Sequence, residues 1–134
     1  MTNSKLVDRA VLSLRQRLLE LHKAVLDAER IELERKVGKL RAAEFLQVVL
    51  RHPRLGWLRP LTDLITRVDT AIADPEDEES ARVLKGSFAG AGALITPPDA
   101  ETAFGSRYLE ILQDEPSVVL AHAATVRELR GANA

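Results

Sequence analysis

The sequence predicts an all-α fold, in which residues 1–134 form a single helical domain: a bundle of about six helices with one long N-terminal helix. Three observations support this prediction. Apolar residues recur at spacings of three and four along successive segments, which is the period of a helix. No segment of five or more residues alternates apolar and polar side chains with the β-branched enrichment of a strand. Prolines and glycines stand between the segments and separate one predicted helix from the next.

The first predicted helix covers residues 4–37, with Asn3 or Ser4 as its N-cap and Gly38 at its end. One heptad seam alternates spacings of four and three: Val7, Val11, Leu14, Leu18, Leu21, Val25 and Ala28. A second column repeats every seven residues: Leu12, Leu19, Leu26, Leu33 and Leu40. Such a helix would span about 50 Å, more than the diameter of a compact domain of this size. We therefore expect a second copy of the chain to cover part of it, in a homodimer that buries the second column.

The same helical period predicts five shorter helices, over residues 40–52, 60–74, 76–84, 99–113 and 116–131. Pro60 suits the first turn of its helix, and Gly131 ends the last one. The far end of the helix that starts at residue 76 is left open, because three glycines follow it. In the last helix Asp114 is the expected N-cap, and the residues expected to face the core are Val118, Val119, Ala123, Val126 and Leu129.

The composition is that of an ordinary soluble globular protein, with 46% hydrophobic and 29% charged residues and a formal net charge of −1. A dedicated nucleic-acid binder would be far more basic, so no nucleic-acid partner is expected. The chain has no cysteine, which excludes disulfides, zinc–thiolate sites and cysteine nucleophiles. Charges recur from the N-terminus onward, and no apolar run approaches the roughly 20 residues that span a bilayer. We expect no membrane partner and a cytoplasmic location.

A polar column follows the first helix between its two apolar columns. Its members are spaced by seven: Asp8, Arg15, His22, Glu29 and Lys36. Polar groups at this position would be partly buried and would need partners. They are interpreted as ion pairs that set the register between helices. The alternative is a polar pocket lined by Arg15, His22 and Glu29 that binds a small anion or another ligand.

Two further clusters are candidate ligand-binding sites. Trp57, the only tryptophan, precedes Arg59 in a loop, where it either anchors a helix corner or forms a recognition hot spot. Arg107 and Tyr108 follow Gly105, a helical glycine that indicates close packing or a ligand. Together Arg59, Arg107 and Tyr108 are of the types that grip a carboxylate or phosphate.

The chain lacks the motifs of the common catalytic and metal sites. Its three histidines do not occur in the Glu-x-x-His pattern of di-iron bundles. No serine lies in a Gly-x-Ser-x-Gly elbow, and no complete nucleotide-binding glycine motif is present. We therefore predict no catalytic residue, no metal and no cofactor.

Two resemblances concern parts of the chain. The segment 81–87 resembles the phosphohistidine segment of histidine-phosphotransfer bundles through Ala81, Leu84, Lys85, Gly86 and Ser87. Arg82 stands where that family has its phosphorylated histidine, so phosphotransfer cannot occur there. The whole chain also resembles an uncharacterised bacterial family of helical proteins, which implies no particular activity. The matching residues are His52-Pro53, 57–61, Phe104-Gly105, Arg107-Tyr108, Pro116 and Val118-Val119.

The function predicted from these features is a non-enzymatic interaction or regulatory module, homodimeric through the long N-terminal helix, with a further protein partner allowed. Residues 1–52 hold 11 Lys/Arg and 7 Asp/Glu, a net of +4, whereas residues 53–134 hold 8 and 13, a net of −5. This split is compatible with antiparallel self-association, with docking inside one chain, or with an ordinary balanced surface. The alternative function is a small-molecule binder or enzyme that uses the polar pocket.

Overall fold

A computed structural model describes residues 8–51 and 53–131 of the chain. The described residues form six α-helices and one 3₁₀ helix, with no strand among them, so the predicted all-α fold is confirmed. The elements are α1 (Arg9–Val37), α2 (Ala42–Arg51), η2 (Pro53–Leu58), α3 (Arg59–Ala73), α4 (Glu78–Ile95), α5 (Ala103–Asp114) and α6 (Pro116–Gly131). The prediction that the longest helix is N-terminal is also confirmed.

Helix α1 is one uninterrupted helix of 29 residues. It begins at Arg9 rather than near residue 4, because the Asp8 carboxylate caps it by accepting from the Ala10 N–H at 2.9 Å. The predicted caps Asn3 and Ser4 lie outside the described residues. The predicted end is confirmed: Gly38 has a φ of 88°, a conformation that favours glycine, and its N–H donates to the Glu34 carbonyl.

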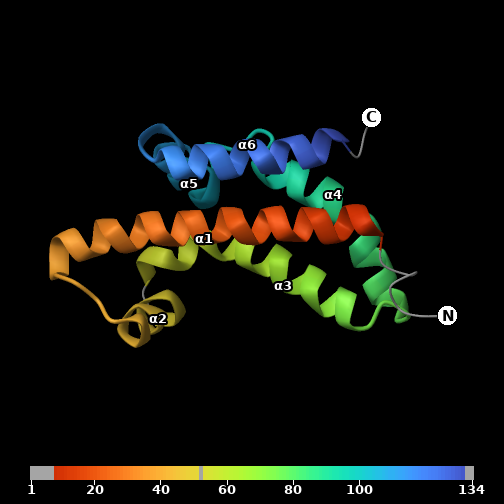
Figure 1. Cartoon of the computed structure of the whole chain (residues 1–134), viewed down its shortest axis with the longest axis horizontal. Coiled ribbons are helices and arrows are strands. Elements are labelled where there is room, and N and C mark those ends of the chain that lie inside the picture. Colours follow the sequence, from red (N-terminus) through yellow and green to blue (C-terminus); the bar gives the residue numbers. More distant parts are fainter. Residues whose placement is uncertain (1–7, 52, 132–134) are drawn as a thin grey trace.

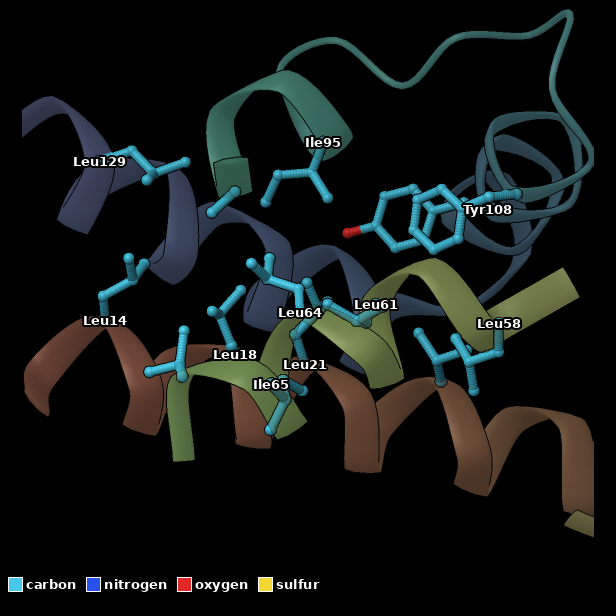
Figure 2. Packing of buried hydrophobic residues seen from close by; sticks show 14 of the residues in the cluster. Leu14, Leu18, Leu21, Leu58, Leu61, Leu64, Ile65, Ile95, Tyr108 and Leu129 are labelled. Atoms are coloured by element: carbon cyan, nitrogen blue, oxygen red, sulfur yellow. The ribbon is translucent and has the colours of Figure 1, made fainter. Parts of the chain in front are cut away.

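The core lies on both sides of α1. In Figure 1, α1 runs along the middle of the molecule, with α5 and α6 on one side and α3 on the other. Leu14, Leu18 and Leu21 point from α1 into the space between these helices (Figure 2). The heptad seam predicted from the sequence is therefore buried from Val11 to Ala28, and it is covered by the same chain.

The second leucine column of α1 is only partly exposed. Leu19 and Leu26 are half-buried against the core of the same chain, whereas Leu12 is 41% exposed. Leu19 and Leu26 are already packed within one chain, because α1 has neighbours of its own chain on two sides; that a second copy covers the rest of the column stays a prediction.

The part of the chain that projects from the bundle comprises the end of α1, the following loop and most of α2. We call residues 30–48 the arm; none of them is buried. Figure 1 shows α1 extending past α5 and α6 towards α2 at one end of the molecule. Arg30 attaches α2 to α1, since it donates to the Leu40 carbonyl at 2.5 Å and lies 5.1 Å from the centre of the Phe45 ring. The arm is held mainly by polar contacts.

Helix α4 continues through Gly86, Gly90 and Gly92, the three glycines after which the sequence alone does not place its end. Only one of the three is close to a side chain of another helix: a Cβ at Gly90 would lie 3.5 Å from Leu64 of α3. Capping explains the start of α4, since the Asp77 carboxylate accepts from the Ser80 N–H. Helix α5 likewise begins at Ala103, four residues later than predicted, because Thr102 is its N-cap.

The prediction for α6 was wrong in two respects. Asp114 is the last residue of α5 and does not cap α6. Val119 and Ala123 are exposed, whereas Thr125 is fully buried. The buried face contains Val118, Thr125 and Leu129, so a threonine occupies a core position that apolar patterning assigns to its neighbours.

Candidate functional site

The polar column of α1 makes contacts with α3. Arg15 forms an ion pair with Asp69, and the His22 ring Nε2 lies 2.9 Å from the Thr62 hydroxyl oxygen. Burial lowers the pKa of His22, so its ring is neutral at pH 7. These contacts link two antiparallel helices, because the earlier residue of α1 meets the later residue of α3.

Glu29 is the most buried charged residue of the described chain, with 2% of its surface exposed. Its carboxylate accepts hydrogen bonds from Trp57 Nε1 at 3.1 Å and from the Arg107 guanidinium at 2.5 Å. Arg107 also pairs with Glu110 at 2.9 Å. The hydrogen bond to Glu29 raises the pKa of Arg107, and the contact with Glu110 adds to this shift. Glu29 therefore connects α1 to both η2 and α5.

A row of aromatic rings continues from Trp57 into the bundle. The ring centres are 5.7 Å apart from Trp57 to Phe104, 5.3 Å from Phe104 to Tyr108 and 5.5 Å from Tyr108 to His122. Tyr108 is fully buried, and burial raises the pKa of its hydroxyl and lowers the pKa of His122. Both groups are neutral at pH 7, and the Tyr108 hydroxyl oxygen and His122 Nδ1 form a hydrogen bond of 2.6 Å.

Gly105 permits the close approach that brings this row together. A Cβ at this position would lie 1.9 Å from the Asp99 carbonyl oxygen, inside the backbone of the loop between α4 and α5. The Gly105 N–H donates to the Thr102 hydroxyl, which caps the helix. Close packing is therefore the reason for the helical glycine.

The structure brings four of the seven predicted site residues together. Glu29, Trp57 and Arg107 are in direct contact, and Tyr108 is joined to Trp57 through Phe104. The remaining three lie apart from them: Arg15 and His22 contact α3 at successive positions two turns apart, and Arg59 is exposed at the start of α3. Within residues 8–51 and 53–131, the cavity that touches Glu29 and Arg107 does not include Arg15, His22 or Arg59.

A small cavity of about 120 Å³ adjoins the Glu29–Arg107 pair. It is lined by Ala28, Glu29, Glu32, Arg107, Ile111, Asp114 and Glu115. Ligand pockets for small molecules usually measure about 300–1,000 Å³. The lining is mostly carboxylate, and Arg107 is already paired with Glu29 and Glu110. The carboxylates that line this cavity attract cations and repel anions, so the cavity does not suit the small anion that the sequence suggested as a ligand.

Sequence reasoning missed Asp69, Thr62 and His122, the partners of the site residues. One signal was present for the first two: Thr62 and Asp69 are spaced by seven, like His22 and Arg15 on α1. Two facing polar columns of equal spacing indicate two helices in register. His122 carried no such signal, because its partner Tyr108 lies on another helix with a different polar pattern.

The segment that resembles histidine-phosphotransfer bundles lies in the first half of α4. Arg82 is exposed and pairs with Glu79 at 2.6 Å, which raises the pKa of Arg82. The hydroxyl of the buried Ser87 donates to the Leu84 carbonyl at 2.8 Å. The Arg82 guanidinium and the Ser87 hydroxyl of this segment are thus occupied by contacts within α4.

No family model, curated protein or solved structure matches the chain. In residues 8–51 and 53–131, no three His, Asp or Glu side chains are grouped so that they could hold a metal ion. None of the helices in this part of the chain is both long and apolar enough to cross a membrane.

Proposed function

We propose that the protein is a non-enzymatic interaction module that forms a homodimer through the arm, the projecting end of its long N-terminal helix together with α2. The observation that carries the proposal is the exposure of three large apolar side chains on the arm. Ile31 is 47%, Leu46 55% and Val37 64% exposed, and no residue of the arm is buried. All three side chains lie on the one element that projects from the bundle, and apolar surface that the chain itself leaves uncovered there favours a protein partner.

The arm is also built to hold its shape without a core of its own. Arg30 and Glu34 form an ion pair at 3.6 Å, and Glu34 accepts from the Leu40 N–H at 2.6 Å. These contacts fix the loop that leads into α2. A partner that meets a fixed surface loses less conformational entropy on binding than one that must order it.

The interior of the bundle supports a structural rather than a catalytic role for the polar residues. Glu29 is neutralised by Arg107, and Tyr108 is hydrogen-bonded to His122. Among the described residues, no buried side-chain nitrogen or oxygen lacks a hydrogen-bond partner. A substrate site needs polar groups directed at the substrate, whereas these groups are directed at one another.

The proposal is tested by measuring the mass of the protein in solution by sedimentation equilibrium. The wild-type chain of 14.8 kDa is expected to behave as a dimer at micromolar concentration. The double variant Ile31→Asp/Leu46→Asp is expected to be monomeric, because it places two charges in the interface. Leu120→Asp is the matched control, since Leu120 is 72% exposed but lies on α6.

A wild-type monomer at these concentrations would overturn the proposal. So would a dimer that survives the arm variant but is lost in Leu120→Asp, since the interface would then lie on α6. Circular dichroism of each variant shows whether the bundle itself remains folded.

A further inference from the structure

We propose that the two copies pair antiparallel, so that the arm of each copy docks on the acidic corner of the other. The acidic corner is the turn between α3 and α4 together with the first two residues of α4, residues 74–79. This inference rests on the proposed function, and it assigns the partner surface that the arm requires. It is carried by the charges and the shape of the two opposite ends of the molecule.

The two ends carry opposite charge. The arm holds five Lys/Arg and three Asp/Glu, a net of +2. The corner holds five Asp/Glu and no Lys/Arg, and these five residues, Asp74, Glu76, Asp77, Glu78 and Glu79, are all exposed. Arg82 pairs with Glu78 and Glu79, and with it included residues 74–82 still carry a net charge of −4.

The two ends also lie at opposite extremes of the long axis. Figure 1 shows α2 at one end and the turn between α3 and α4 at the other. A two-fold axis perpendicular to the long axis places each arm beside the corner of the other copy, and it forms two identical contacts in a closed dimer. A parallel pair would place arm against arm and corner against corner, where like charges repel.

A groove for apolar side chains adjoins the corner. Its volume is about 460 Å³. It is lined by the apolar residues Val11, Pro75, Ala81, Leu84 and Phe88 and by one residue of each charge, Asp8 and Lys85. The arm offers exposed apolar side chains, and the corner offers this groove with carboxylates beside it. Apolar contact with a charged rim of complementary sign is the usual composition of a specific interface.

Cross-linking distinguishes the two orientations, because the natural chain contains no cysteine. Leu46→Cys in the arm and Ala81→Cys at the groove are both exposed positions. A flexible bismaleimide is expected to join the two variants when they are mixed and to join neither variant to itself. Leu120→Cys mixed with Ala81→Cys is the control, and it is expected to remain uncross-linked.

Charge reversal gives an independent measurement of the same contact. Lys36→Glu/Lys39→Glu in the arm, or Glu76→Lys/Glu78→Lys at the corner, is expected to raise the dimer Kd at least about tenfold, because like charges then face each other. The chain with all four substitutions is expected to regain the wild-type Kd within about threefold. Asp63→Lys/Glu101→Lys changes the net charge as the corner variant does, but away from both ends, and should leave the Kd unchanged.

The outcomes separate this inference from the proposed function. A wild-type dimer in which Leu46→Cys cross-links to itself, or in which the fourfold variant is no tighter than either double variant, overturns the antiparallel pairing and leaves the proposed function standing. A dimer in which the mixed variants do not cross-link overturns it as well. A wild-type monomer overturns both.

Discussion

Residues 11–29 and residues 30–37 belong to the same helix, yet only the first part contains residues that the rest of the chain buries. In the first part the seam from Val11 to Ala28 is buried, and Glu29 is the last buried residue. In the second part Ile31 and Val37 are 47% and 64% exposed. The helix itself does not change at Glu29, so the difference is due to its neighbours.

Helix lengths explain the difference. At about 1.5 Å per residue, α1 is about 44 Å long, whereas α3 with 15 residues is about 23 Å long and α6 with 16 about 24 Å. Shorter helices cannot cover the whole of a longer one. The comparison shows that an apolar residue on an amphipathic helix is buried only where a neighbouring helix lies beside it. The part of α1 that extends past its neighbours keeps its apolar side chains exposed to other contacts.

The largest expected effect compares one residue from each part of α1. Leu21→Ala removes a side chain with 0% exposure and is expected to lower the free energy of unfolding by about 2–5 kcal/mol, because it leaves a cavity in the core. Ile31→Ala, on the same helix, is expected to change it by less than about 0.5 kcal/mol in the monomeric protein. Urea denaturation monitored by circular dichroism measures both.

Equal losses for the two substitutions would contradict the comparison, because they would mean that the arm is covered within one chain. Measurement at several protein concentrations separates the two origins of a loss at Ile31. A loss that grows with concentration comes from the dimer.

A smaller effect is expected at Glu29, where the two parts of the helix meet. Glu29→Gln keeps an oxygen that accepts from Trp57 but removes the charge that pairs with Arg107. The expected loss is about 1–3 kcal/mol in the free energy of unfolding, since a hydrogen bond between charged groups in a buried site is lost. Glu110→Gln removes the other carboxylate that pairs with Arg107, at an exposed position, and is expected to cost less than about 0.5 kcal/mol.

Thermal or urea denaturation of the two glutamate variants tests this ranking. If Glu110→Gln costs as much as Glu29→Gln, the stabilising effect belongs to Arg107 alone and not to its buried partner. Glu29 would then not mark an energetic boundary between the bundle and the arm.

Much of the fold could be predicted from the sequence, because helical periodicity and chain breakers are local signals. The seam of α1, its end at Gly38 and the position of Pro60 in the first turn of α3 depend only on neighbouring residues. The start of α1 depends on Asp8, whose spacing of seven predicts a member of the polar column but whose carboxylate caps the helix. The end of α4 could not be predicted, because glycine has a low helix propensity and yet the three glycines of α4 are helical in the folded chain.

The site was harder to predict, because its contacts join helices that are distant in the sequence. Glu29, Trp57 and Arg107 were selected one by one, but their contact depends on how closely α5 packs, which Gly105 and the Asp99 backbone decide. Thr125 shows the same limit: a polar residue is buried at a core position of α6, where its hydroxyl donates to the Ala121 carbonyl. Hydrophobic patterning has no means of finding such a residue.

The smallest expected effect is a pH dependence confined to the bundle. Burial lowers the pKa of His22 and His122 below their ordinary value of 6.5 in the folded protein. Between the folded pKa and 6.5 the unfolded chain binds more protons, so the free energy of unfolding falls as the pH falls through this window and is fully restored above it. Urea denaturation at a series of pH values is expected to show this slope.

Two substitutions separate the histidines from the other titrating groups. The double variant His22→Gln/His122→Asn replaces both histidines by residues that do not titrate. The new amide at position 22 lies near the position of Nε2 and the one at position 122 near the position of Nδ1, so each can keep the hydrogen bond of the histidine that it replaces. The double variant is expected to show a flatter slope below pH 6.5 than the wild type. An unchanged slope would mean that groups outside these two contacts, including those of the arm, cause the pH dependence.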